Sequence, residues 1–211
     1  ALVDMGFNRN DVDPCVFNKS FYGKQCTLVV YVDDLLITSE SEPALGEVVA
    51  ELKRRFGDVK YSDDADISYL GMHIRVEKGA AIVSMEAYVR GVLKEFPTTG
   101  VVTTPATADL FAQSKRTTGL TKARSRQYHT IVAKLLYVAK RSRVDILLTV
   151  AALCTRVREP NEDDWMKLER LMKYLNGTAD QVLVLRPTTL NMVGYIDAAF
   201  GCHEDGKVTL G

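Results

Sequence analysis

Short apolar runs separated by turn residues dominate the beginning of the chain. Three of these runs are rich in β-branched and aromatic residues, which is typical of strands: residues 15–19, 27–32 and 35–38. The segment 21–24 lies between the first two runs and suits a hairpin connection. The last two runs flank Asp33-Asp34, so we expect a further hairpin with two carboxylates at its tip.

Between Ser41 and Gly57 the apolar residues instead recur at intervals of three and four. This spacing predicts an amphipathic helix, because such positions share one face of a helix. Ser41 suits the N-cap of this helix, and Gly57 suits the position after its last turn. A second hairpin is predicted over residues 67–76 and 81–84, and a second helix over residues 85–96.

The periodicity stops after Pro97. Residues 98–121 are rich in Thr, Ala and Gly and show no repeat, so the main boundary of the chain is expected there. Three amphipathic helices are predicted beyond it, over residues 128–143, 145–158 and 161–177. Two short strands are expected to follow, at residues 182–185 and 193–196.

The composition excludes several classes of protein. Of the 211 residues, 46% are hydrophobic and 26% charged, as in an ordinary folded protein rather than a disordered or fibrous one. The longest apolar stretch, from Ile146 to Cys154, is too short to span a bilayer, which takes about 20 residues. Four cysteines at irregular spacings favour a reducing compartment. We therefore expect a fragment of a longer intracellular protein without a membrane span.

Positive charge is concentrated in one part of the chain, although the formal net charge is zero. Between Leu110 and Val144 there are nine basic residues and no acidic one. This cluster has two interpretations: a solvated helix face, or a surface that attracts phosphates.

Asp33-Asp34 is the sharpest chemical feature of the sequence. Two adjacent carboxylates are costly to bury unpaired, and a hairpin tip lets them project together. A divalent cation can then offset their repulsion. In two-metal phosphoryl transfer, clustered aspartates hold the two ions. The alternative is an exposed Asp-Asp turn without a chemical role.

Several segments occur in an order shared with one known family. They are Gly6-Phe7 with residues 13–17 (DPCVF), residues 27–39 (TLVVYVDDLLITS), residues 69–74 (YLGMHI), residues 135–146, residues 165–178 and residues 194–198 (GYIDA). Together they extend over nearly all of the chain, and in this order they resemble the copia-type reverse transcriptases of LTR retrotransposons.

The resemblance implies an α/β (α+β) fold: a polymerase palm fragment with an antiparallel hairpin sheet, a helical thumb or connection region, and truncated RNase H-like strands. Residues 1–97 are then expected to form the C-terminal part of the palm and residues 98–126 a linker. Residues 127–180 correspond to the thumb or connection region, and residues 181–211 to the start of an RNase H-like domain.

The same resemblance implies roles for particular residues. Asp33 and Asp34 are expected to be catalytic carboxylates that bind two Mg²⁺ ions, for which Mn²⁺ can substitute. Asp197 corresponds to the first metal-binding acid of the RNase H domain. Tyr31 is expected beside the primer terminus and the incoming nucleotide. Leu70-Gly71-Met72 resembles the primer grip, with a plain buried hairpin as the alternative.

The implied partners are an RNA or DNA template–primer duplex and a deoxynucleoside triphosphate (dNTP). Contacts to the duplex backbone are expected from Lys134, Lys140, Arg141 and Arg143. The family further implies the rest of the Pol polyprotein (fingers, RNase H, integrase and protease) and Gag as partners. It also implies a cytoplasmic virus-like particle with access to the nucleus. The oligomeric state is left open.

Two departures from the family determine what this segment is expected to do. The strand that carries the third palm carboxylate, D-x-x-x-A-F, does not occur before Tyr31, and the fingers are absent as well. We therefore expect RNA-directed DNA polymerase activity in the parent polyprotein and none in this segment alone. Two alternatives stay open: a non-catalytic nucleic-acid-binding remnant or domesticated retrotransposon protein, and an unrelated metal-dependent nucleotidyl transferase.

Overall fold

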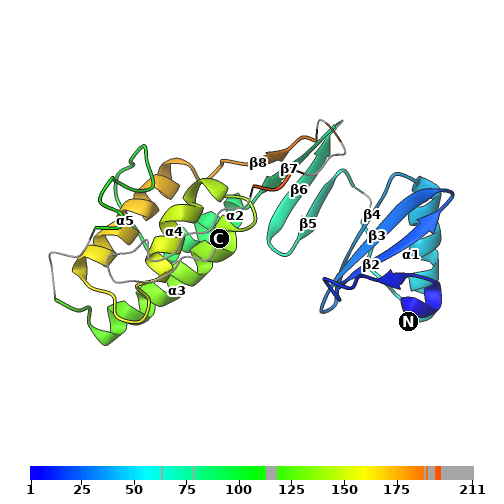
Figure 1. The fold of residues 1–211 in the computed structure, drawn as a ribbon, viewed down its shortest axis with the longest axis horizontal. Coiled ribbons are helices and arrows are strands. Elements are labelled where there is room, and N and C mark those ends of the chain that lie inside the picture. Colours follow the sequence, from blue (N-terminus) through cyan, green and yellow to red (C-terminus); the bar gives the residue numbers. More distant parts are fainter. Residues whose placement is uncertain (63, 78, 113–117, 188, 190–192, 196–211) are drawn as a thin grey trace. The chain divides into compact units, whose positions relative to one another are not determined.

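The computed structural model describes residues 1–211 apart from 63, 78, 113–117, 188, 190–192 and 196–211. The described residues form two antiparallel sheets and five α-helices, which confirms the mixed α/β class predicted from the sequence. They divide into two compact units, residues 1–69 and the described residues from 70 onward (Figure 1). None of the helices in these ranges is both long and apolar enough to cross a membrane.

The first unit is an antiparallel sheet with one helix on it. Its strands pair in chain order: β1 (Asn8–Arg9), β2 (Val16–Phe21), β3 (Lys24–Tyr31) and β4 (Asp34–Ser39). Helix α1 (Glu42–Phe56) lies along one face of this sheet (Figure 1). Ser41 caps α1 as predicted, because its side chain accepts a hydrogen bond from the backbone N–H of Ala44. Gly57 follows the helix with a positive φ of +82°, which glycine adopts without steric cost.

Alternation along β3 determines which face of the sheet is buried. Cys26 and Leu28 are fully buried and pack with Val48 and Leu52 of α1. Because successive side chains of a strand point to opposite faces, the residues between them lie on the other face. No helix in the described part of this unit covers that second face.

The second unit combines four helices with strands β6 (Met72–Glu77), β7 (Ala80–Ser84) and β8 (Leu183–Leu185). β5 (Asp66–Tyr69) precedes β6 in the sheet order β5-β6-β7-β8, and the boundary between the units falls in the turn between β5 and β6. The helices share one apolar core, and their bounds are α2 (Glu86–Glu95), α3 (Lys122–Ala139), α4 (Leu147–Cys154) and α5 (Glu162–Gly177).

The strand predicted at residues 182–185 forms, as β8, and its partner is β7. Ala81 lies opposite Leu185, so a segment near the C-terminal end of the described chain completes the sheet of the β6–β7 hairpin. Residues 193–195 carry no strand, and residues 196–211 lie outside the described residues, including Asp197. The assignment of residues 181–211 to an RNase H-like domain stays a prediction.

Two of the helices after the boundary begin or end at other residues than their apolar periodicity predicts. α3 begins at Lys122 because Thr121 caps it, accepting a hydrogen bond from the N–H of Arg124. The end of the predicted linker, residues 122–126, is therefore helical. The first turns of α3 are polar and carry no apolar stripe, which is why periodicity alone placed the start at Tyr128. α4 is shorter than predicted and follows a 3-10 turn, Val144–Ile146.

A buried arginine connects the turn after α3 to the end of α5. Arg143 is only 1% exposed, and its side chain donates two hydrogen bonds to the Asp145 carboxylate, at 2.9 and 2.8 Å. It also donates to the carbonyl oxygen and the hydroxyl of Thr178, at 2.7 and 2.9 Å. Tyr174 donates its hydroxyl to the same carboxylate. The charge of Arg143 is thus fully compensated inside the protein.

Replacing Arg143 with methionine is expected to destabilise the second unit. The substitution leaves Asp145 without its cation and removes both bonds to Thr178, which should cost about 3 kcal/mol. Urea denaturation followed by circular dichroism measures this loss. The control is Arg126→Met, because Arg126 is exposed on α3 and its loss should cost under about 0.5 kcal/mol. Equal stability of the two variants would contradict the role of Arg143.

The stabilising effect of Arg143 is also expected to depend on pH. Burial opposes ionisation of Asp145, but the hydrogen bonds from Arg143 and Tyr174 and the charge of Arg143 outweigh burial and lower the pKa of Asp145. A group with a lowered folded-state pKa contributes stability above its unfolded pKa of about 3.9 and loses it as the pH falls through the folded value. The difference in the free energy of unfolding between the native chain and Arg143→Met should therefore be largest at neutral pH and should decrease below about pH 4.

Candidate active site

The Asp-Asp pair lies at the tip of the β3–β4 hairpin. The register places Tyr31 opposite Asp34, so Val32 and Asp33 form the two-residue turn between the strands. The hairpin predicted from the two flanking apolar runs is confirmed, but the turn lies one residue earlier than the sequence indicates. Asp34 does not belong to the turn, because it pairs with Tyr31 as the first residue of β4.

The hairpin turn contains a residue in a left-handed conformation. Val32 has a φ of +56° and a side chain that is 85% exposed. This backbone region is unfavourable for L-residues and most of all for β-branched ones, because the Cβ substituents crowd the backbone. Two-residue hairpins require such a conformation to follow the strand twist. The apolar strands therefore impose strain on Val32 next to the two carboxylates.

Strand alternation brings Tyr31 and Asp34 to one face of the sheet. Leu28 and its partner Ile37 lie on the α1 face, so Tyr31 and Asp34 lie on the opposite face. Both residues are exposed, as is Asp33 at the tip. The first unit thus presents a phenol and one carboxylate on the open face of the sheet, and a second carboxylate follows in the adjoining turn.

The two carboxylates provide the oxygen donors that Mg²⁺ prefers. Neither Asp33 nor Asp34 has a hydrogen bond or an ion pair to its carboxylate among the described residues. Their charges are therefore available to a cation. No group of three His, Cys, Asp or Glu side chains that could hold a metal occurs within the described ranges. The donor set thus fits a divalent cation only in part and requires ligands from elsewhere.

A second tight turn joins β5 to β6 at the segment predicted to resemble the primer grip. Leu70 and Gly71 form its centre, with φ values of +50° and +73°, the pattern of a type I′ hairpin turn. The predicted hairpin thus includes an additional turn, because residues 67–76 divide into two strands. Met72 begins β6 and packs against the core of the second unit.

Comparison with known proteins identifies the family of this hairpin-bearing chain. Residues 1–108 match the family described as reverse transcriptase (RNA-dependent DNA polymerase). The chain belongs to this family. The match includes both the β3–β4 hairpin and the Leu70-Gly71 turn. No solved structure matches the chain.

Curated relatives of the chain include retrovirus-related Pol polyproteins from transposons, which confirms the copia-type assignment of this reverse transcriptase segment. The chain is 28% identical to a retrovirus-related Pol polyprotein from transposon RE2 of Arabidopsis thaliana over 99% of its length. It is 27% identical to that from transposon TNT 1-94 of Nicotiana tabacum over 92% of its length. It covers only 14% and 15% of those two polyproteins, which is about one seventh of the length of each.

The four basic residues predicted to contact a duplex backbone differ in their surroundings. Lys134 forms an ion pair with Glu95. Lys140 is exposed at the end of α3. Arg141 is half-buried and lies over the ring of Tyr137, 3.5 Å from its centroid. Arg143 is buried, so its prediction as a phosphate contact is corrected: its donors are used by Asp145 and Thr178.

Sequence reasoning missed two tyrosines in this region of the reverse transcriptase segment. The Tyr137 hydroxyl donates a 2.6 Å hydrogen bond to the carbonyl oxygen of Leu70. Tyr88 stacks on Tyr137 with the ring centroids 5.3 Å apart. Tyr137 belongs to a motif used for the resemblance, but its spacing from Leu70 along the chain carries no signal of contact. The bond depends on how α2 and α3 pack in the core.

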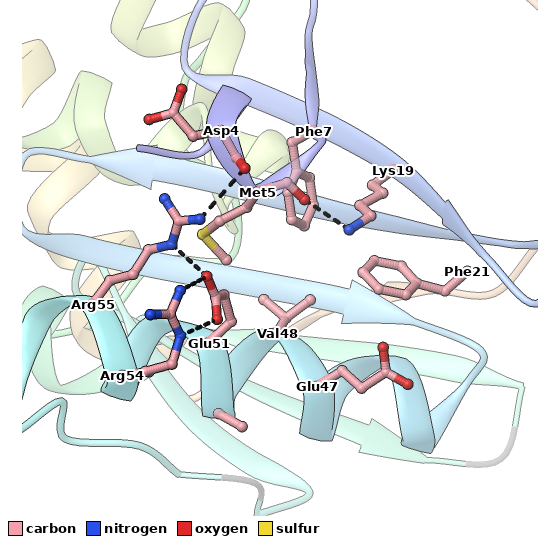
Figure 2. A pocket seen from close by; sticks show the side chains of 11 residues that line it. Asp4, Met5, Phe7, Lys19, Phe21, Glu47, Val48, Glu51, Arg54 and Arg55 are labelled. Atoms are coloured by element: carbon pink, nitrogen blue, oxygen red, sulfur yellow. Dashed lines mark hydrogen bonds and ion pairs between the residues drawn. The ribbon is translucent and has the colours of Figure 1, made fainter.

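The first unit also contains a pocket of about 490 Å³ (Figure 2), and neither Asp33 nor Asp34 lines it. Phe21 and Val48 line it, so it opens on the α1 side of the sheet. Glu51 lies at its edge, where hydrogen bonds from Arg54 and Arg55 lower the pKa of Glu51 to about 2. Glu51 is thus paired with both arginines of the lining, and this pocket is separate from the candidate site.

Replacing Val32 with glycine is expected to stabilise the first unit. Glycine adopts a positive φ without steric cost, and this gain exceeds the extra entropy of its unfolded chain, for a net of about 0.5–1 kcal/mol. Thermal unfolding measures the change. The control is Val12→Gly, an exposed loop position without a positive φ, where the same substitution should destabilise. A loss of stability in Val32→Gly would refute the strain.

Proposed function

We propose that this chain forms part of a retrotransposon RNA-directed DNA polymerase and carries the aspartates of its catalytic centre. The observation that carries this proposal is the exposed, unpaired Asp33-Asp34 pair at a strained hairpin tip, in a chain of the reverse transcriptase family. The reaction is attack of a primer 3′-OH on the α-phosphate of a dNTP. A new phosphodiester bond forms, pyrophosphate leaves, and the hydroxyl proton is released.

Asp33 and Asp34 would hold two Mg²⁺ ions in this reaction, or Mn²⁺ in their place. Asp33, at the tip, is the direct ligand, and Asp34 supports it from the first position of β4. When bound, the ions activate the attacking oxygen and stabilise the leaving pyrophosphate. The described residues contain no group of three metal-binding side chains, and a third carboxylate would come from the parent polyprotein.

Other residues would orient the nucleic acid. Tyr31 shares the open face of the sheet with Asp34 and would lie beside the primer terminus and the dNTP. The turn at Leu70-Gly71, with Met72, would hold the primer end. Lys140 and Arg141 have no carboxylate partner in the described part of the chain and would contact the duplex backbone.

The architecture of the complete polymerase follows from the same proposal. The sheet and α1 of the first unit would belong to the palm, the helices α3 to α5 to the thumb or connection, and residues 181–211 to the start of an RNase H domain with Asp197. The chain would act within a Pol polyprotein that also supplies fingers, integrase and protease. Together with Gag, it would assemble in a cytoplasmic virus-like particle.

Binding of Mn²⁺ at the hairpin tests the metal role directly. Mn²⁺ is paramagnetic and is expected to broaden the backbone amide signals of residues 31–35 in NMR spectra before others. Asp33→Asn and Asp34→Asn should each weaken this broadening, because each removes a charged oxygen donor. Asp11→Asn, at an exposed loop position of the same unit, is the control and should leave it unchanged. Broadening that spares the hairpin would argue against the site.

The isolated chain is expected to bind a template–primer duplex without extending it. Binding should weaken with salt, and Lys140→Gln with Arg141→Gln should reduce the salt slope by about two, one for each lost cation. Asp33→Ala should leave the slope unchanged. Lys122→Gln with Arg126→Gln, exposed on the same helix, is the matched control. Primer extension by the isolated chain that Asp33→Asn abolishes would disprove its inactivity.

The complete parent protein distinguishes this proposal from the binding-remnant alternative. In a polymerase, primer extension by the parent should fall below detection in Asp33→Asn. A parent that binds the duplex and extends no primer would instead be a non-catalytic nucleic-acid-binding remnant.

A further inference from the structure

The Leu70-Gly71 turn is supported by two helices of the second unit. Tyr137 of α3 donates its hydroxyl to the Leu70 carbonyl oxygen at 2.6 Å. Tyr88 of α2 lies next to Gly71, where an added Cβ would lie 3.7 Å from its ring. The two rings stack on each other at an interplanar angle of 28°. The position of the turn is thus determined by one hydroxyl and by the aromatic stack behind it.

Tyr137 also contacts a cation. Arg141 follows it by one turn of α3, and its guanidinium lies over the ring, 3.5 Å from the centroid. One Arg141 N–H donates to the backbone carbonyl of Tyr137 at 3.2 Å. No carboxylate in the described chain pairs with Arg141. Its orientation is therefore restrained while several of its five donors stay available.

The neighbouring cations show that this arrangement is particular to Arg141. Lys134 is paired with Glu95, and Arg143 is buried against Asp145. A guanidinium that is restrained but unpaired suits a phosphate, because its planar donors match two phosphate oxygens and little side-chain entropy is lost on binding. Arg141 is thus the arginine of this group best arranged for a phosphodiester.

We propose that Tyr137 is a positioning residue that connects the Leu70-Gly71 turn to Arg141. Its hydroxyl holds the turn and its ring holds the guanidinium, so one side chain fixes the distance between a primer terminus at the turn and a primer phosphate at Arg141. Tyr137 itself contacts neither. This inference rests on the proposed function, since it specifies how the same segment recognises the end of a primer.

Three variants separate the two contacts of Tyr137. Tyr137→Phe removes the hydroxyl and keeps the ring under Arg141. Tyr88→Phe is the matched control, because it deletes a hydroxyl from the same stack that makes no hydrogen bond within the described residues. Arg141→Gln removes the cation and leaves Tyr137 intact. The two phenylalanine variants should have equal midpoints of urea unfolding, which would show that the global fold is unaffected.

The first measurement compares binding of two fluorescent duplexes, one with a recessed primer 3′ end and one blunt, by the 211-residue chain. The native chain should prefer the recessed end. Tyr137→Phe should reduce this preference about fivefold, as expected for one hydrogen bond, with an unchanged salt slope. Arg141→Gln should weaken binding to both duplexes and lower the salt slope by about one. Tyr88→Phe should behave as the native chain.

The second measurement needs no nucleic acid. Amide hydrogen exchange at Gly71 and Met72 should accelerate in Tyr137→Phe and not in Tyr88→Phe, because only the first variant releases the turn. Unchanged exchange in Tyr137→Phe would overturn the positioning role. Accelerated exchange in Tyr137→Phe together with an undiminished preference for the recessed end would also overturn the positioning role. Failure of the native chain to bind either duplex would instead refute the proposed function on which the inference rests.

Discussion

The burial of β3 under α1 is the constraint on which the geometry of the first unit depends. Cys26 and Leu28 are completely enclosed, and a strand offers such positions only at every second residue. A shift in register by one residue would expose both and bury their neighbours. The phenol of Tyr31 and the carboxylate of Asp34 therefore keep their place on the open face because of apolar residues that take no part in any chemistry.

The second unit depends on a buried polar contact among its helices. Arg143 occupies a position where the helices converge, and its guanidinium is shared by Asp145 and Thr178. A buried arginine is tolerated only when its donors are satisfied in a fixed geometry. Here that requirement links the turn after α3 to the last residues of α5. The basic cluster in the sequence is therefore not one surface, since its members include a core residue and an ion pair of Lys134.

Local patterns in the sequence predicted the elements that local physics determines. The apolar runs on either side of Asp33-Asp34 predicted the hairpin, and Ser41 with Gly57 predicted the limits of α1, because strands and capped helices depend on neighbouring residues. Thr121 could also have been recognised as an N-cap. The sequence pattern contains no information on the distant partner of Arg143, Thr178, which lies 35 positions away in the chain. Nor does it reveal that the Tyr137 hydroxyl meets Leu70, because that contact forms only after α3 packs.

The pairing of β8 with β7 has a consequence for how the second unit forms. Its two strands lie about one hundred residues apart in the chain, and α2 to α5 lie between them. Closing so long a loop is entropically costly, so this pairing is expected late, after the helices have collapsed. During synthesis β7 leaves the ribosome long before its partner. For that interval one edge of the hairpin has unpaired backbone groups, and it is then that the chain is most exposed to association with other strands.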